Sequence, residues 1–125
     1  MATADQIRQV LERYTAAVSA GDGETAVSFF APGATAHDPV DGPDLDAEGL
    51  AKLIAASAGV IRGVRMTGPV RISADCRHAA APIEADVDFG EGPQIMSVID
   101  VMTFDDDARI TSMAAYYGPA SLREA

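Results

Sequence analysis

The second half of the chain, from about Val64 onward, constrains the fold most strongly. Extended stretches there are separated by turn signals at Ala74-Asp75, Gly90-Glu91-Gly92 and Asp105-Asp106-Asp107. Gly and Asp favour turns because glycine tolerates positive φ and the aspartate side chain can bond to nearby backbone. Strands joined by short turns pair antiparallel. The pattern therefore predicts an antiparallel meander of four strands.

The first residues of the chain carry the signals of a helix. Thr3 and Gln6 have the spacing of a capping box, in which each side chain bonds the other residue's backbone N–H. Apolar residues then recur at helical spacing. They are Ile7, Val10, Leu11, Tyr14, Ala17 and Val18. Gly21 is suited to the position just after the helix end.

Two further helices are expected before the meander. One runs from about Gly23 to Phe30 and is broken at Pro32 and Gly33. The other begins after Asp46, which can cap it. Its buried side comprises Leu50, Leu53 and Ile54, and it ends near Gly59. Between these two helices, residues 34–38 are predicted to form a short strand.

Helices first and strands afterwards indicate the α+β class, with the helices on one face of the sheet. We therefore expect three N-terminal helices packed in the concave face of a strongly curved, mainly antiparallel sheet. Such a sheet forms a cone with an internal apolar pocket. The length of 125 residues fits a single domain spanning residues 1–125.

Charge and composition exclude several function classes. The formal net charge is −10 and the basic residues are scattered, so nucleic acid and anionic membranes are not expected partners. No apolar run approaches the ~20 residues that span a bilayer, and no signal peptide is evident. A cytoplasmic location is expected. Cys76 is the only cysteine, and His37 and His78 lack ligand spacing, so no metal is expected.

Asp100 is the most informative polar residue. Counting by twos along its strand places it on the same face as Met96, Val98, Met102 and Phe104. An acid on an apolar face is a local violation of the folding pattern, and such violations are often functional. Burial without a cation would raise its pKa and keep it protonated. Alternatively, Asp100 pairs with an arginine from elsewhere, or a bulge turns it outward.

Tyr14 and Asp38 are weaker candidates when each is taken alone. Tyr14 lies on the apolar side of the first helix, and many core tyrosines simply bond a carbonyl. Asp38 precedes Pro39, and Asp-Pro is a common turn former. On a strand, however, Asp38 shares a face with Ala34 and Ala36, which would bring its carboxyl to the rim of a cavity.

Together these residues resemble the ketosteroid isomerase family over nearly the whole chain. The resemblance is carried by five blocks, residues 12–14 (Glu-Arg-Tyr), 34–39 (Ala-Thr-Ala-His-Asp-Pro), 66–71 (Met-Thr-Gly-Pro-Val-Arg), 98–105 (Val-Ile-Asp-Val-Met-Thr-Phe-Asp) and 109–117 (Arg-Ile-Thr-Ser-Met-Ala-Ala-Tyr-Tyr). The family's general base matches Asp38, and its two oxyanion-hole donors match Tyr14 and Asp100.

The resemblance implies a cofactor-free and metal-free isomerase that converts 5-ene-3-oxosteroids to 4-ene-3-oxosteroids through a dienolate. Asp38 would shuttle the proton, while Tyr14 and a protonated Asp100 would hold the developing oxyanion, as in the family's known chemistry. The ligand would be a flat, apolar, polycyclic ketone. By the same resemblance, a homodimer is expected.

The resemblance also assigns candidate substrate-binding residues. They are Phe30, Ile83, Ala85, Val87, Met96, Val98, Met102, Phe104, Met113, Ala115 and Tyr117. Supporting tyrosines of well-known members match Phe30 and, less securely, Ala55, so a hydroxyl network behind Tyr14 is shortened here. Tyr117 stands where some relatives place a tryptophan.

Two other functions remain open from the sequence. One is a polyketide cyclase-like enzyme on the same fold, and the other is a non-catalytic domain that binds an apolar ligand or a partner protein. A purely structural arrangement, in which Tyr14 and Asp100 only bond each other inside the core, also remains open.

Overall fold

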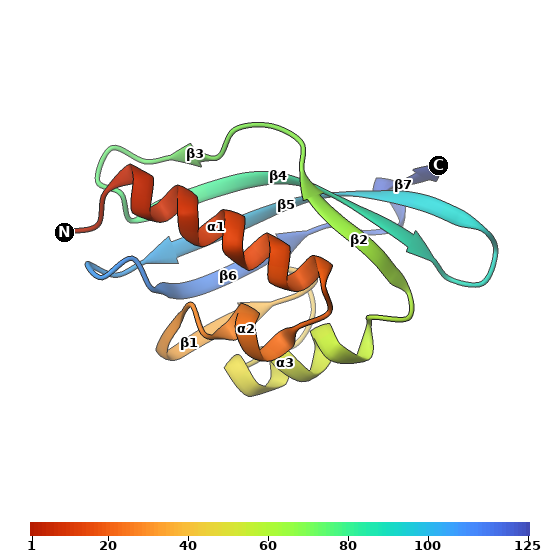
Figure 1. Ribbon diagram of the computed structural model, residues 1–125, viewed down its shortest axis with the longest axis horizontal. Helices are drawn as coiled ribbons and strands as arrows, with labels where there is room; N and C mark the ends of the chain where they lie inside the picture. The colour runs from red at the N-terminus through yellow and green to blue at the C-terminus, as the bar shows by residue number, and fades with distance from the viewer.

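The computed structural model describes residues 1–125 and confirms the α+β class (Figure 1). Three helices pack against one side of a seven-stranded sheet. The helices are α1 (Ala4–Ser19), α2 (Gly23–Val27) and α3 (Ala47–Ala56), with a short 3-10 turn, η1 (Pro119–Ser121), near the C-terminus. The strands are β1 (Phe30–His37), β2 (Ile61–Met66), β3 (Arg71–Ile72), β4 (His78–Asp88), β5 (Pro93–Phe104), β6 (Ile110–Tyr116) and β7 (Leu122–Glu124).

The helix starts follow the capping chemistry expected from the sequence. The Thr3 hydroxyl accepts from the Gln6 N–H at 3.2 Å, and the Gln6 amide oxygen accepts from the Thr3 N–H at 2.9 Å. Asp46 caps α3 by accepting from the Gly49 N–H at 2.8 Å. The second helix is shorter than predicted because Phe30 already belongs to β1.

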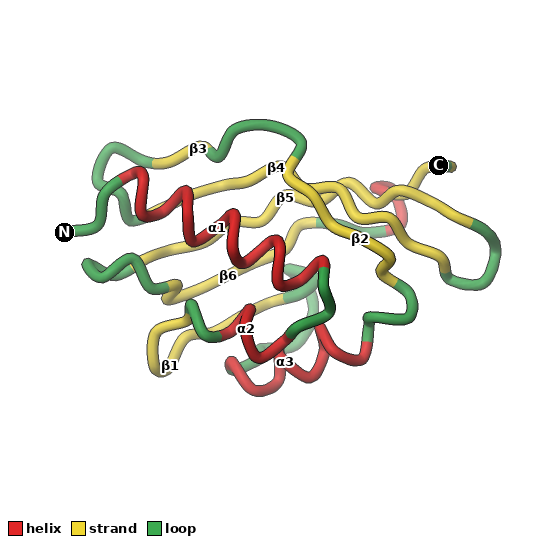
Figure 2. Tube along the Cα trace, in the orientation of Figure 1, coloured by secondary structure: helices red, strands yellow, loops and turns green.

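The sheet has the strand order β1-β6-β5-β4-β2, with β3 also paired to β4 and β7 to β5. Strands β4, β5 and β6 form the predicted antiparallel meander, and all three predicted turns lie in loops between strands (Figure 2). The segment expected to be its first strand is divided into β2 and β3, with Pro69, which lacks an N–H, between them. β1 is longer than predicted and joins β6 in parallel.

The sheet and helices form a packed end and a hollow end. At the packed end, the first half of α1 lies over the end of β5 and the start of β6 (Figure 1, left). Its largest fully buried side chains include Ile7, Leu11, Met102, Ile110 and Met113. At the other end, β2 lies beside the end of α1, and the two elements are joined by a 2.9 Å bond from the Val64 N–H to the Ser19 hydroxyl.

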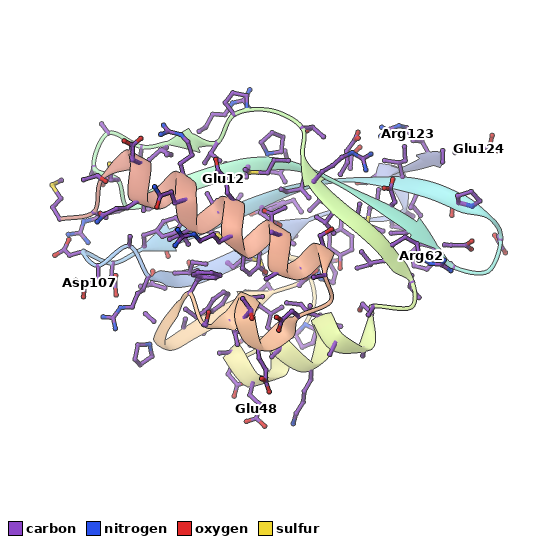
Figure 3. All side chains as sticks on the ribbon, viewed as in Figure 1. Glu12, Glu48, Arg62, Asp107, Arg123 and Glu124 are labelled. Carbon is purple, nitrogen blue, oxygen red and sulfur yellow. The ribbon has the colours of Figure 1, made fainter.

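Most charged side chains lie at the outside of the molecule. The six labelled in Figure 3 (Glu12, Glu48, Arg62, Asp107, Arg123 and Glu124) are all exposed. None of the three helices is both long enough and apolar enough to cross a bilayer.

The contact between α2 and α3 depends on a missing side chain. A Cβ placed on Gly23 would lie 2.1 Å from the carbonyl oxygen of Ala51, which is backbone of α3 and cannot swing aside. This close approach sets the position of α3, whose end forms part of the hollow end.

Gly23→Ala should therefore destabilise the fold, because the added methyl forces the two helices apart. Overpacking of this kind costs about 1–3 kcal/mol, and urea unfolding measures it. Gly59→Ala is the matched control, since its Cβ would meet nothing within 4 Å and its φ is outside the left-handed region. Equal stability of the two variants would contradict the close approach.

Candidate active site

A cavity of about 320 Å³ occupies the hollow end of the molecule. The second half of α1, the end of α3, β2 and the middle of the sheet surround it. Fourteen of its eighteen lining residues are hydrophobic, and none is Lys, Arg or His. Its ionisable groups are two carboxyls and two phenols, from Tyr14, Asp38, Asp100 and Tyr117. The cavity is therefore an apolar container with a small set of acidic groups and no cation to balance them.

Asp100 faces this cavity from the middle of β5, where it pairs in register with Ala81 of β4 and Ala115 of β6. Its carboxyl forms no hydrogen bond or ion pair with another side chain, and Arg109 instead pairs with Asp105 and Asp107. Burial, and then the negative charge of Asp38, raises the pKa of Asp100 to about 7. Its carboxyl is thus available to donate a hydrogen bond into the cavity when protonated.

Tyr14 reaches the same cavity from α1. The residue is only 3% exposed, and its ring packs on Phe30 with 6.1 Å between centroids. The Tyr14 hydroxyl forms no hydrogen bond within the protein. Because every fully buried side-chain polar atom has a partner, this hydroxyl is not fully buried, and it opens onto the cavity. Burial, with the nearby charges of Asp100 and Asp38, raises the pKa of Tyr14 well above its usual value. Tyr14 therefore remains a protonated donor, and it does not bond Asp100.

Asp38 follows β1 at the cavity wall. The loop after it is tied to β6 by a 2.8 Å bond from the Val40 N–H to the Ala115 carbonyl. The Tyr117 hydroxyl donates to Oδ1 of Asp38 at 2.7 Å. Burial raises the pKa of Asp38, and the bond from Tyr117 opposes that shift. Its second oxygen, Oδ2, has no protein partner.

These groups provide the parts of a proton-transfer site. An ionised Asp38 can accept a proton from a carbon acid, while Tyr14 and a protonated Asp100 can donate hydrogen bonds to a developing oxyanion. The apolar lining excludes competing water and favours a flat, apolar ligand. No group of three or more His, Cys, Asp or Glu side chains is placed to hold a metal ion.

The structure brings most of the predicted site residues together. Besides Tyr14, Asp38 and Asp100, the predicted residues in the lining are Ile83, Ala85, Val87, Met96, Val98, Ala115 and Tyr117. Four predicted wall residues lie elsewhere, which corrects that expectation. Met102, Phe104 and Met113 are buried in the packed end, and Phe30 stands behind Tyr14 without lining the cavity.

Several lining residues were missed by the sequence reasoning. They are Thr15 and Val18 on α1, Ala56 and Ser57 at the end of α3, and Val60, Ile61 and Val64 around β2, with Phe89 at the end of β4. Helical spacing identified Val18 as apolar, but it could not separate a core contact from a cavity wall. Ala55, the position matched to a supporting tyrosine, is exposed and does not line the cavity.

Comparisons with known proteins identify the family and the fold of the chain. The family model described as "SnoaL-like domain" matches residues 11–113. A steroid Delta-isomerase from Nocardioides simplex is 35% identical over 118 residues, which cover 94% of each sequence. Among solved structures, SalBIII, an epoxide hydrolase/cyclase-like enzyme described for its role in pyran ring formation in the polyether salinomycin, matches with a TM-score of 0.83, at 18% identity, over 97% of each chain. That similarity shows the fold alone.

Asp100→Asn tests the protonation of the buried acid. Because the pKa of folded Asp100 is raised to about 7, the folded chain holds the proton more tightly than the unfolded chain, whose Asp pKa is about 3.9. This stabilisation is fully present below the unfolded pKa and is lost as pH rises through the folded pKa. The variant has no carboxyl at this position, so it does not lose this stabilisation as pH rises. Its free energy of unfolding relative to that of the wild type should therefore increase between pH 4 and 7, by up to about 1.4 kcal/mol per pH unit, and then level off.

Denaturant melts of both proteins at pH 4, 5.5, 7 and 8.5 measure this difference. Glu12→Gln, which removes a charge from the exposed side of α1, is the control and should show no such trend. A variant less stable than wild type at pH 7 would mean that Asp100 is ionised and paired.

Proposed function

Because the chain belongs to the SnoaL-like domain family and has a steroid Delta-isomerase among its relatives, we propose that it is a cofactor-free 3-oxosteroid isomerase. The resemblance to the ketosteroid isomerase family is confirmed by the same findings. The proposed reaction converts a 5-ene-3-oxosteroid into its 4-ene isomer.

In the proposed mechanism, the Asp38 carboxylate removes a proton from the carbon between the ketone and the double bond. The C–H electron pair forms a new double bond, and charge moves to the ketone oxygen to give a dienolate. The Tyr14 hydroxyl and the protonated Asp100 donate hydrogen bonds to that oxygen. Asp38 then returns the proton at the far end of the conjugated system, so atoms and electrons balance without a cofactor.

One observation supports this proposal above the others. Tyr14 and Asp100 both open onto one apolar cavity with no protein partner for their donors, and Asp38 opens onto the same cavity with one free oxygen. A structural core would have paired these groups, because buried polar groups nearly always find partners. Groups left open in a preformed cavity are suited to a ligand that supplies an acceptor and an acidic C–H.

Two other functions would use the same cavity, and an isomerase assay distinguishes them from the proposed one. A cyclase-like enzyme would act on another polycyclic ketone with the same acid and base. A binding domain would hold an apolar ligand without turnover. Steroid binding without isomerisation favours one of these two.

The purified protein should isomerise a 5-ene-3-oxosteroid, measured by the ultraviolet absorbance of the conjugated enone. EDTA should not change the rate. A rate no higher than buffer at micromolar protein would contradict the proposal.

Asp38→Asn should lower kcat by at least ~10²–10⁴-fold, the usual contribution of a general base, while steroid binding survives. Asp5→Asn, an exposed aspartate on α1 paired with Arg8, is the control and should leave kcat unchanged. Near-normal turnover by Asp38→Asn would assign the base to another residue.

We also propose that two copies pair through the outer face of β5 and β6. Ile99, Val101 and Tyr116 on this face are 43%, 37% and 50% exposed. Ile99 pairs in register with Tyr116, and Val101 with Ala114, so the apolar side chains form one continuous uncharged area. A self-complementary apolar area suits a two-fold dimer, in which each copy presents the same surface. The large negative charge elsewhere would oppose contact through other faces.

Val101→Glu should make the protein monomeric, because the new carboxylate would lose its water inside the interface. Sedimentation velocity compares it with wild type, which should sediment as a dimer. Ala55→Glu, on the exposed side of α3, is the control and should remain dimeric. A monomeric wild type would contradict this interface.

A further inference from the structure

Tyr117 lines the cavity, but its hydrogen bond to Asp38 indicates a role beyond that of a wall residue. The cavity holds four ionisable side chains, and only one side-chain hydrogen bond joins any two of them, the 2.7 Å bond from the Tyr117 hydroxyl to Oδ1 of Asp38. The other phenol, Tyr14, and the other carboxyl, Asp100, face the cavity unpaired. The two carboxyls therefore have different surroundings, although both are buried in the same apolar space.

The bond also fixes the orientation of Asp38. The main chain beyond Asp38 is already tied to β6 through the bond from the Val40 N–H to the Ala115 carbonyl. Tyr117 lies two residues after Ala115, so its hydroxyl adds a second tie from the same end of β6. With Oδ1 occupied, Oδ2 is the oxygen that remains free toward the cavity.

Two carboxyls close together without a cation cannot both ionise easily, so the pair tends to keep one proton. A hydrogen bond from a phenol stabilises a carboxylate more than a neutral carboxyl, because charged acceptors form the stronger bonds. The Tyr117 bond therefore favours the form in which Asp38 is ionised. The proton then remains on Asp100, which has no such donor.

We propose that Tyr117 is a positioning residue whose hydroxyl holds Oδ1 of Asp38, so that Oδ2 exchanges the proton with substrate and the proton shared by the two carboxyls stays on Asp100. Its kinetic consequence rests on the proposed isomerase function, but the placement of the proton does not. Without the bond, some protein molecules would carry the proton on Asp38 and a negative charge on Asp100. In those molecules Asp38 could not accept a proton and the Asp100 carboxylate could not donate a hydrogen bond, so they would be inactive.

The other groups around Asp38 do not replace the effect of Tyr117 on its pKa. Burial raises the pKa of Asp38, and the Tyr117 bond lowers it. Asp100 and Tyr14 face Asp38 across the cavity, Asp41 lies near Tyr117, and all of these are neutral or negative. No basic side chain lines the cavity to take over the role of the phenol.

Tyr117→Phe removes the hydroxyl and keeps the ring. In the profile of kcat/KM against pH, the acidic limb should move upward by about one pH unit, because a hydrogen bond to a charged group is worth roughly that much. The maximum should also fall, while KM changes little because the apolar ring remains. Thr67→Val is the control, since it removes an exposed hydroxyl from the loop after β2, outside the cavity and outside the proposed dimer face. Its profile should match wild type.

A second measurement does not depend on activity. In protein labelled with ¹³C at the aspartate carboxyls, the Asp38 and Asp100 signals are assigned by their loss in Asp38→Asn and Asp100→Asn. Tyr117→Phe should move the Asp38 titration to higher pH, and Thr67→Val should not. If Tyr117→Phe fails to fold, the reciprocal effect is measured in Asp38→Asn, where loss of the carboxylate should let Tyr117 ionise at lower pH in an ultraviolet tyrosinate titration.

The outcomes separate the two proposals. An inactive wild type whose Asp38 titration still moves in Tyr117→Phe overturns the isomerase function and supports the role of Tyr117. An active wild type whose pH profile and Asp38 titration are unchanged in Tyr117→Phe overturns the role of Tyr117 and leaves the function standing.

Discussion

Two carboxyl groups share one apolar cavity with no basic side chain, and the rest of the site follows from that constraint. Taking a charge out of water is unfavourable, so each carboxyl must be protonated or hydrogen-bonded by a neutral donor. The pKa of Asp100, raised to about 7 by burial and by the charge of Asp38, favours protonation of that carboxyl, and the hydrogen bond from Tyr117 serves Asp38. In the proposed function, their different environments provide a hydrogen-bond donor and a base from the same residue type, at the expense of a local region that is less stable than an apolar core would be.

Much of the fold followed from local chemistry in the sequence. The capping box at Thr3 and Gln6, the cap at Asp46 and the turns of the meander depend on near neighbours, which the sequence displays directly. The inward direction of Asp100 followed from the period of a strand. The parallel pairing of β1 with β6 was not predicted, because it joins segments about eighty residues apart and no local pattern encodes it.

In the candidate site, too, local patterns were predicted and contacts between distant segments were not. Period two correctly placed Met96, Val98, Met102 and Phe104 on the face of Asp100, but it carries no information about depth along the strand. Where the first half of α1 covers the sheet, Met102 and Phe104 are packed, and beyond that point Met96 and Val98 border a cavity. The bond between Tyr117 and Asp38 was missed for a similar reason, since two distant strand ends meet only in the folded chain.

The separation of a packed end from a hollow end affects how the ligand preference of such a chain can evolve. Strands β4, β5 and β6 each run through both ends, so one half of every strand secures the fold while the other half lines the cavity. Side chains such as Val60, Ile61 and Phe89 border space and are not locked among neighbours on all sides. Replacing them would alter which ligands fit without opening a void in the packed core. New substrate preferences can therefore arise by substitution at one end while the other end preserves the architecture.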